Sequence, residues 1–369
     1  MPSLEYLQKA FLELVRAGLW EKEARLSQFG KVDYEEIMRL AEEQSLVGLV
    51  TAGLEQVKDV KVPHEILLQF IGSTLQIEQQ NSDMNKYIGV LMGKLQKAEI
   101  YAILVKGQGI AQCYEKPLWR ASGDVDLYLS NSNYQAAKEF LIPLASHVDN
   151  EEKNLLHMGM TIDGWVVELH GTMYGEISRR MNKGLDEVHR DIFYGGAVRS
   201  WNNNGVQVFL PSADNDVLIV FTHFLQHFFV EGVGLRQICD WCRLLWRYKD
   251  VIDVKLLEKR LCRMGLMTEW RVFAALAVEH LGMAADTMPF YDSRFKVKGE
   301  KALKRVLKTG NFGHNKDLSY RTKFRGVKYK VVATWRRFWD FITLIPIFPI
   351  DAPTFFAGYG VGKKKGRKK

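Results

Sequence analysis

Apolar residues recur every three or four positions through much of the first 97 residues. Leu7, Phe11 and Leu14 fall on one side of a helix with this spacing, and the same period continues through residues 34–57. No residue pattern typical of a catalytic or metal site accompanies these positions. We therefore predict an all-helical N-terminal region over residues 1–97, with a role in packing or partner contact.

From residue 98 onwards the apolar segments become shorter, and turn residues separate them. The runs at 101–105 and 125–129 have the length and composition of strands, and a helix is predicted at 133–141. One more short strand is predicted at 206–210. We therefore expect residues 98–212 to form a small mixed sheet with helices attached to it.

A hairpin is predicted inside this region. The dipeptide Asp163-Gly164 lies between two apolar runs, residues 155–162 and 165–170. Asp-Gly is preferred in the type I′ turn, because both of its central residues take positive φ. Side chains alternate along a strand, so Glu168 and His170 share one face of the returning strand.

Helical spacing returns in residues 213–293, and the last part of the chain is strongly basic. Residues 294–369 contain 21 Lys and Arg against four acids, a net charge of +17, whereas the whole chain carries +8 and residues 1–293 therefore −9. The pattern predicts an α+β protein: a small mixed-sheet core flanked by N-terminal and C-terminal helical regions, with a basic, aromatic and partly disordered tail.

Three interpretations of the tail remain open. It is a solvated extension, or residues 338–369 attach to an anionic membrane surface, or the tail binds nucleic acid through phosphate contacts and aromatic stacking. The apolar run at 341–350, interrupted by Pro346 and Pro349, is too short to span a bilayer. Because it adjoins the lysine-rich end at 363–369, it favours a membrane surface over nucleic acid.

Two aspartates are the centre of the candidate chemistry. Asp124 and Asp126 are separated by one residue at the start of a predicted strand, so their side chains emerge on the same face. Adjacent carboxylates repel unless a cation lies between them, and Mg²⁺ (or Mn²⁺) prefers oxygen ligands and bridges to phosphates. Glu168 supplies a third carboxylate. We predict these three residues as metal ligands and catalytic residues; the alternative is that they are solvated loop acids.

The end of the first predicted strand has features of a phosphate site. Gly107 would let the backbone approach a triphosphate closely, and the amides of the following helix favour negative charge. Lys106 and Arg120 could neutralise phosphate oxygens as charge develops. We predict that Lys106, Gly107, Gln108 and Arg120 bind the nucleotide.

Taken together, these segments resemble the uncharacterised bacterial nucleotidyltransferases of the DNA polymerase beta superfamily. Four segments carry the resemblance: Leu104-Val-Lys-Gly107, Arg120, Gly123-Asp-Val-Asp-Leu127 and Val167-Glu-Leu-His170. It extends through the helical segments at 223–227 and 235–240 and covers residues 1–290. The resemblance implies that Asp124 and Asp126 are the metal-binding pair and that Glu168 is the third acidic position. Gln108 departs from the serine or glycine usual in that superfamily.

The C-terminal helical region contains a His-x3-His and a Cys-x2-Cys, which admit a zinc site: His223, His227, Cys239 and Cys242. Both pairs fall inside predicted helices rather than on tight turns, which favours a helix face lining the cleft. Asp240 would anchor a histidine or cap locally. We place four residues in contact with the substrate or with the catalytic residues: His170, His223, His227 and Asp240.

The leading hypothesis is a metal-dependent nucleotidyltransferase with a two-metal mechanism. It would move NMP from an NTP to a hydroxyl of an unidentified acceptor, a small molecule, glycan or protein, and release pyrophosphate. One alternative is a catalytically inactive scaffold or nucleotide sensor at a membrane surface, and another is an RNA-modifying nucleotidyltransferase. Four cysteines and a start without a secretory signal favour a cytoplasmic location, with or without attachment to the inner face of the membrane.

Overall fold

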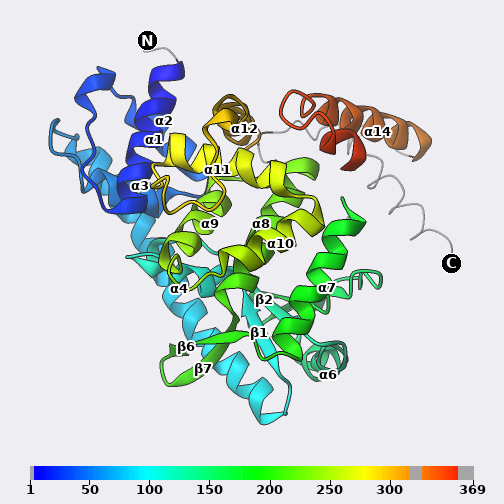
Figure 1. Cartoon of the computed structure of the whole chain (residues 1–369). Coiled ribbons are helices and arrows are strands. Elements are labelled where there is room, and N and C mark those ends of the chain that lie inside the picture. The colour runs from blue at the N-terminus through cyan, green and yellow to red at the C-terminus, as the bar shows by residue number, and fades with distance from the viewer. Residues whose placement is uncertain (1–3, 176, 314, 316–325, 356–369) are drawn as a thin grey trace.

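The computed structural model describes residues 4–175, 177–313, 315 and 326–355 (Figure 1). The first part of the chain is helical: α1 (Leu4–Trp20), η1 (Ser27–Phe29), α2 (Tyr34–Glu43), α3 (Val47–Leu54) and α4 (His64–Lys97). Close packing of α1 on α3 depends on glycine. A Cβ on Gly18 would lie 2.0 Å from the backbone oxygen of Leu49, and one on Gly53 would lie 2.0 Å from that of Leu14.

A mixed five-stranded sheet follows. Its strands are β1 (Ala102–Val105), β2 (Asp124–Leu129), β3 (His147–Val148), β4 (His157–Ile162) and β5 (Trp165–His170). Their order across the sheet is β1-β2-β5-β4-β3; β2 and β5 run parallel, and the other neighbours are antiparallel. The segments between them hold α5 (Gly107–Ala111), η2 (Pro117–Trp119), α6 (Asn131–Leu141) and η3 (Ile142–Leu144). The predicted α+β fold with a small mixed sheet is confirmed.

A separate two-stranded sheet adjoins the first. It pairs β6 (Val198–Asn203) with β7 (Val206–Pro211), of which only β7 was predicted. The strand β6 has a mixed, largely polar sequence, so its hydrophobic pattern is weak. Its turn residues, Asn204 and Gly205, have φ of 50° and 89° and form the Asn-Gly connection favoured in tight hairpins.

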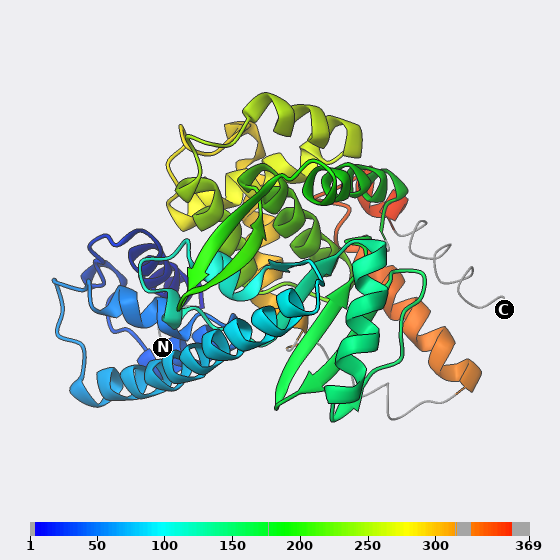
Figure 2. The same cartoon turned by 90° about the horizontal axis from the view of Figure 1, so that it is seen from below.

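The two faces of the five-stranded sheet differ in chemistry. One face is apolar and is covered by α4 and α6, with Ile88, Leu127 and Leu169 in the same buried cluster (Figure 2). Because side chains alternate along β2, Asp124 and Asp126 lie on the opposite face. The candidate catalytic residues therefore face the helices that follow the sheet. Packing against α4 and α6 anchors their strands from the opposite face.

Those later helices are α7 (Arg179–Phe193), α8 (Ala213–Val230), α9 (Leu235–Arg247), α10 (Val254–Met264), α11 (Met267–Leu281), α12 (Lys296–Thr309) and α14 (Gly326–Ile342), with η4 (Ser293–Phe295) and η5 (Asn311–Gly313). They share a hydrophobic core with the N-terminal helices. For example, the indole Nε1 of Trp20 on α1 donates to the backbone oxygen of Leu281 at the end of α11, at 2.5 Å.

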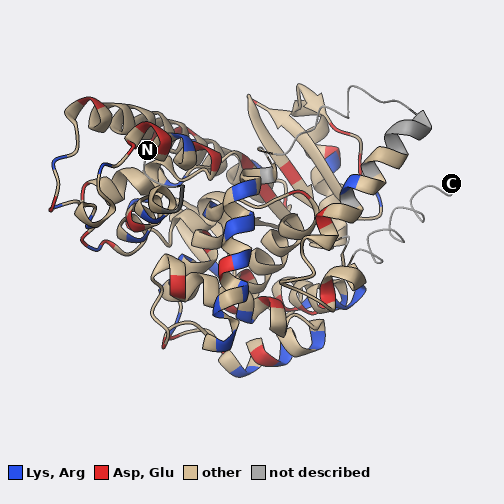
Figure 3. Ribbon diagram, turned by 90° about the horizontal axis from the view of Figure 1, so that it is seen from above, with Lys and Arg blue, Asp and Glu red and all other residues tan. Residues whose placement is uncertain are grey.

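The start of the basic region is packed against this core. On α12, the residues Ala302, Leu303, Val306 and Leu307 are buried against α11, because their spacing forms an apolar stripe on one side of the helix. Lys301, Lys304 and Lys308 are exposed on its other side, whereas Arg305 is half-buried with its Cζ 5.7 Å from the ring centroid of Phe228; Figure 3 shows how basic residues are distributed over the molecule. An ordered α12 is compatible with a tail that is only partly disordered, which stays a prediction for residues 294–369.

The apolar run near the C-terminus contributes aromatic side chains to the core. Phe341, Phe348 and Phe355 are buried, and their ring centroids lie 6.2, 5.3 and 4.8 Å from that of Phe229 on α8. These rings cover α8 and are not available to a lipid surface, because burying them against other aromatic rings removes apolar area from water. The lysine-rich end at 363–369, which is part of the segment predicted to attach to a membrane surface, lies outside the described residues.

Within the described ranges, no helix combines the length and apolar character needed to cross a membrane.

Candidate active site

The register of the parallel strands brings three carboxylates together. In the pairing of β2 with β5, Asp126 lies directly opposite Glu168. Asp124 is two residues before Asp126 on the same face, and ligand oxygens of all three residues lie within 4.8 Å of one another. The structure thus assembles the predicted group of acids.

Lys106 reaches this group from the end of β1. Its Nζ lies 2.7 Å from Oδ1 of Asp126, and burial, which lowers the pKa of Lys106, is outweighed by the charges of Asp126 and Asp124, so that this pKa is raised. Lys106 has φ 58° and ψ −146°, a conformation that costs about 1–3 kcal/mol for a residue other than glycine. Gly107 follows with φ 38°. The strained backbone directs the ammonium group towards the carboxylates.

Two histidines hold the carboxylates from the side of β4 and β5. His170 Nε2 lies 2.7 Å from Asp126 Oδ1 and 3.4 Å from Glu168 Oε2, and His157 Nε2 lies 3.2 Å from Glu168 Oε2. The group His157, Glu168 and His170 also has ligand atoms within 4.8 Å of one another. His157 was not predicted, although a two-residue turn at 163–164 pairs it with His170 by position alone.

The site distributes its charge unevenly. Asp126 and then burial raise the pKa of Asp124 above its usual value. Burial acts in the same direction on Asp126, but Lys106 and His170 outweigh it and lower the pKa of that carboxyl. Burial is likewise outweighed at Glu168, where hydrogen bonds with His157 and His170 lower the pKa. Negative charge on Asp124 is therefore poorly compensated by the protein's own groups.

A cavity of about 490 Å³, including its open mouth, adjoins these residues. Its lining contains seven of the predicted site residues: Lys106, Gly107, Arg120, Asp124, Asp126, His223 and Asp240. Two further residues, Arg236 and Gln237, come from α9 and were not predicted. Burial, followed by the charges of Lys106 and His227, lowers the pKa of His223 well below its usual value, so a neutral imidazole faces the cavity at neutral pH.

Arg120 and Asp240 form a buried ion pair in the wall of this cavity. Arg120 donates from Nε to Oδ1 of Asp240 at 3.0 Å and from Nη2 to Oδ2 at 2.7 Å. Tyr114 also donates to Oδ1 of Asp240, at 2.8 Å. The expected contact between Asp240 and a histidine is therefore not found; its partners are an arginine and a tyrosine, because the segment before β2 packs directly on α9.

The side chain of Gln108, where β1 meets α5, contacts α4 and the segment before β2. Its side chain is buried and donates to Oδ1 of Asn81 at 2.7 Å and to Oγ of Ser122 at 3.1 Å. It does not line the cavity. The amide side chain thus ties the end of β1 to α4, and only its backbone lies beside Gly107.

The sequence pattern of the uncharacterised nucleotidyltransferase family matches residues 30–282. The chain belongs to this family. Among solved structures it is similar to the crystal structure of an antigenic nucleotidyltransferase-like protein from Paracoccidioides brasiliensis, with 15% sequence identity and a TM-score of 0.33; the match covers 54% of this chain and 92% of that chain. No curated protein sequence matches the chain.

The histidine and cysteine pairs of this nucleotidyltransferase do not meet. The ring centroids of His223 and His227 on α8 lie 4.5 Å apart in an edge-to-face arrangement, and His227 Nδ1 lies 3.1 Å from Oε2 of Glu231. Cys239 and Cys242 are buried on α9. In the described parts of the chain, the groups able to hold a metal ion contain neither cysteine, and the interpretation of these residues as a helix face lining the cleft stays a prediction.

Arg236 lines the cavity of this nucleotidyltransferase but was not predicted as a site residue. Its Nη1 donates to the backbone oxygen of Ala121, its Nε is buried without a hydrogen-bond partner, and no described carboxylate forms an ion pair with it. Burial and then the neighbouring Arg120 lower its pKa. A signal was present, since Arg236 lies four residues before Asp240 and so on the same side of α9.

Proposed function

We propose that the chain is a metal-dependent nucleotidyltransferase that moves NMP from an NTP to a hydroxyl group of an acceptor. The observation that carries this proposal is the group formed by Asp124, Asp126 and Glu168, with ligand oxygens within 4.8 Å of one another. It lies beside Lys106 and opens into a cavity of about 490 Å³. Membership in a nucleotidyltransferase family supports the same chemistry.

The donor set fits a hard divalent cation such as Mg²⁺ or Mn²⁺. Asp124, Asp126 and Glu168 offer carboxylate oxygens only, and Asp126 raises the pKa of Asp124, as expected where a positive charge is needed between two acids. The cation would supply charge neutralisation at the phosphates and a lower pKa for the acceptor hydroxyl. His157 and His170 would keep the carboxylates oriented from behind.

The reaction assigned to the site is a substitution at the α-phosphorus. The acceptor oxygen forms a bond to that phosphorus, the bond to the bridging oxygen breaks, and pyrophosphate leaves with its electron pair. The hydroxyl proton departs on the side of Glu168, where carboxylate charge favours its loss. Holding both reactants next to each other at the site makes the attack effectively intramolecular.

We assign the phosphates to Lys106, Gly107 and Arg236. Lys106 and Arg236 line the cavity, and Arg236 has no carboxylate partner among the described residues, so a phosphate can complete its hydrogen bonds. Gly107 takes a positive φ and leaves room for close approach of the backbone. Arg120 would act differently from the expectation: it holds the wall through Asp240 and adds its charge from there.

The test is transfer of label from α-³²P-labelled NTPs in the presence of Mg²⁺ and a host-cell extract, with pyrophosphate release measured in parallel. Wild-type protein should label an acceptor, and Asp124→Asn should not. Nucleotide binding without pyrophosphate release would instead support the scaffold or sensor hypothesis. Labelling confined to RNA would support the RNA-modifying alternative.

We also propose that α14 contacts an anionic membrane surface. Trp335 and Trp339 lie one helical turn apart with ring centroids 5.7 Å from each other, and they are 61% and 46% exposed. Val331 and Phe338 are exposed on the same helix. The segment 326–342 contains four Lys and Arg and one Asp, so its charge complements acidic lipid headgroups. Exposed indoles beside basic residues are typical of interfacial helices.

A further inference from the structure

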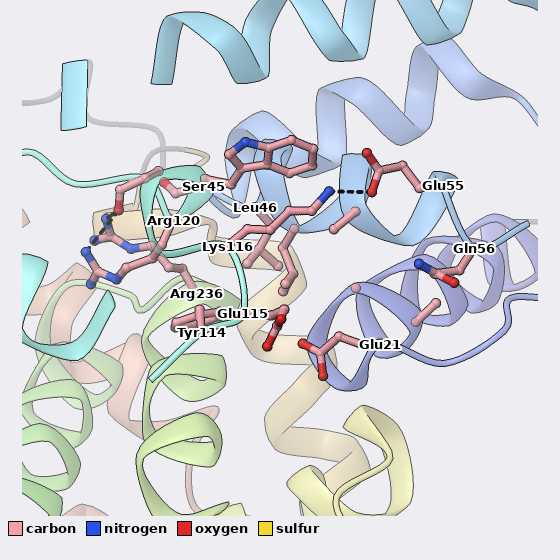
Figure 4. A pocket seen from close by; sticks show the side chains of 17 residues that line it. Glu21, Ser45, Leu46, Glu55, Gln56, Tyr114, Glu115, Lys116, Arg120 and Arg236 are labelled. Carbon is pink, nitrogen blue, oxygen red and sulfur yellow. Dashed lines mark hydrogen bonds and ion pairs between the residues drawn. The ribbon is translucent and has the colours of Figure 1, made fainter. Parts of the chain in front are cut away.

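A second cavity lies next to the candidate active site. It has a volume of about 590 Å³, including its open mouth, which is the size of cavities that bind small organic molecules. It lies between α1, α3, the segment 114–121 and α9 (Figure 4). Glycines permit this arrangement: a Cβ on Gly48 of α3 would lie 2.1 Å from the backbone oxygen of Trp119.

The two cavities share a wall. Arg120 and Arg236 line both of them, and Figure 4 shows these side chains together at one end of the second cavity. A molecule in the second cavity is therefore separated from Asp124 and Asp126 by two guanidinium groups, one of which has a buried Nε without a hydrogen-bond partner. A second substrate in this position would lie next to nucleotide phosphates held in the first cavity.

The far end of the second cavity is acidic. Glu21, Glu55 and Glu115 contribute to its lining, whereas its floor is formed by apolar side chains of α3, including Leu49 and Ala52. Glu21 pairs with Arg243 at 3.2 Å, and Glu115 has no ion-pair partner among the described residues. The charge of Glu115, which no described cation pairs, would repel a phosphate at this end of the cavity and attract a cation.

The walls already hold one ammonium group. Lys116 Nζ lies 3.6 Å from the ring centroid of Trp119 and 2.5 Å from Oε2 of Glu55. On the opposite side, Glu21 and Glu115 lie near each other (Figure 4). Burial raises the pKa of Glu21, and the charge of Arg243 opposes this effect. The charge of Glu115 raises the pKa of Glu21 further, which shows that the two carboxylates repel each other. A cation between them would relieve this repulsion.

We propose that this second cavity binds the acceptor, and that the acceptor is an organic molecule with a hydroxyl group at one end and a protonated amine at the other. The proposal rests on the proposed function. The amine lies between Glu21 and Glu115, the carbon skeleton contacts Leu49 and Ala52, and the hydroxyl points past Arg236 towards the carboxylates. The hydroxyl oxygen then bonds to the α-phosphorus, its proton is released on the side of Glu168, and pyrophosphate leaves.

The test uses three probes of equal length that differ in charge: 6-aminohexan-1-ol, hexane-1,6-diol and 6-hydroxyhexanoate. Binding is measured by saturation-transfer NMR titration without nucleotide. We expect the amine to bind at least threefold tighter than the diol and the carboxylate to bind weakest. Glu115→Gln should weaken binding of the amine about threefold, the size of a partly exposed ion pair, with little effect on the diol.

Two variants complete the design. Ala52→Trp fills the floor and should abolish binding of all three probes, whereas Glu258→Gln, an exposed acid on α10 far from the lining, should change none of them. Melting curves of each variant show that the fold is retained. Equal binding of amine and diol, an unchanged preference in Glu115→Gln, or no saturable binding of any probe would overturn the proposal.

These outcomes are separable from the fate of the proposed function. Binding of the probes needs no nucleotide, so a chain that never releases pyrophosphate can still show the charge preference. Conversely, metal-dependent labelling of an acceptor from cell extract, combined with no charge preference in the probe titration, would overturn the acceptor proposal alone. With labelled NTP and Mg²⁺, the amine probe should be labelled faster than the diol.

Discussion

Asp126 and Glu168 face each other across the parallel pair of β2 and β5, and the imidazole of His170 lies between their carboxylates. The two acids come from strands whose first residues are 41 positions apart in the sequence, and Leu127 and Leu169 anchor the opposite face of the sheet. The protein thus fixes two like charges side by side before any substrate arrives. Such preorganisation costs stability and is expected where charge is used in function.

Replacing Asp124 should separate stability from activity. Asp126 raises the pKa of Asp124, so Asp124→Asn removes a repulsion and should raise the melting temperature of the metal-free protein by a few degrees, about 1 kcal/mol. The same change should reduce metal-dependent NTP turnover by about 100-fold or more, since a metal ligand is lost. Thermal melts and pyrophosphate release measure the two effects. Unchanged turnover would contradict the assignment of Asp124.

Asp126→Asn is the matched comparison. It leaves Lys106, whose side chain is only 13% exposed, without its carboxylate partner, so it should lower the melting temperature where Asp124→Asn raises it. Both variants should lose turnover. If the two melting temperatures shift in the same direction, the unequal charge distribution of the site is incorrect.

The ion pair of Arg120 and Asp240 should behave as a structural unit. Both side chains are almost fully buried, at 6% and 3% exposure, so Arg120→Met should destabilise the protein by about 3–5 kcal/mol by leaving a buried carboxylate unpaired. The double variant Arg120→Met with Asp240→Leu should recover a large part of this loss. Urea denaturation measures both, and additive losses would show that the pair is not coupled.

Arg236 lies in the same wall of the cavity as Arg120, but its replacement is expected to weaken nucleotide binding and not stability. It has no carboxylate partner among the described residues, and burial together with Arg120 lowers its pKa, so Arg236→Met should cost little stability. Loss of a phosphate contact should weaken binding of a Mg²⁺–NTP analogue about tenfold, as measured by calorimetry. Arg263→Met, on the exposed end of α10, serves as the control and should leave the affinity unchanged.

Glu269 should make stability depend on pH. It is fully buried, both carboxylate oxygens lack a hydrogen-bond partner, and burial followed by the charge of Asp351 raises its pKa well above the usual value. As pH rises through the usual pKa, the unfolded chain loses this proton while the folded chain keeps it, so stability falls with rising pH. Glu269→Gln should remove a slope of at most about 1.4 kcal/mol per pH unit.

Urea denaturation of wild type and Glu269→Gln between pH 5 and pH 8 measures this effect. The difference in free energy of unfolding between the two proteins should grow in favour of the variant as the pH rises. Parallel pH profiles would contradict it, and Glu258→Gln, an exposed acid, should give the wild-type profile.

Attachment through α14 should depend on its indoles and on lipid charge. Wild-type protein should cosediment with vesicles that contain phosphatidylserine and less with vesicles of phosphatidylcholine alone, and added salt should reduce the bound fraction. Trp335→Ala with Trp339→Ala should remove most of the binding, since both rings are exposed. Binding to RNA in place of vesicles would favour the nucleic-acid interpretation of the basic region.

The local pattern of the chain determined the individual elements. Alternation placed Asp124 and Asp126 on one face of a strand, and Asp163-Gly164 fixed a two-residue hairpin, because turn geometry and strand period act over only a few residues. The turn even determined that His157 pairs with His170, although that consequence was not drawn from the sequence. The helix α12 was not predicted, because its many charged residues leave only a narrow apolar stripe.

Only the tertiary structure decided which elements meet. The parallel pairing of β2 with β5 set Glu168 beside Asp126, and no local signal specifies which strands become neighbours. Packing of α9 on the segment before β2 tied Arg120 to Asp240 and left Arg236, on the same wall, without an ion pair to any described carboxylate. The carboxylate pair on β2 followed from the strand period alone. Its approach to Glu168 and its neighbouring cavity followed from long-range packing, which sequence spacing does not encode.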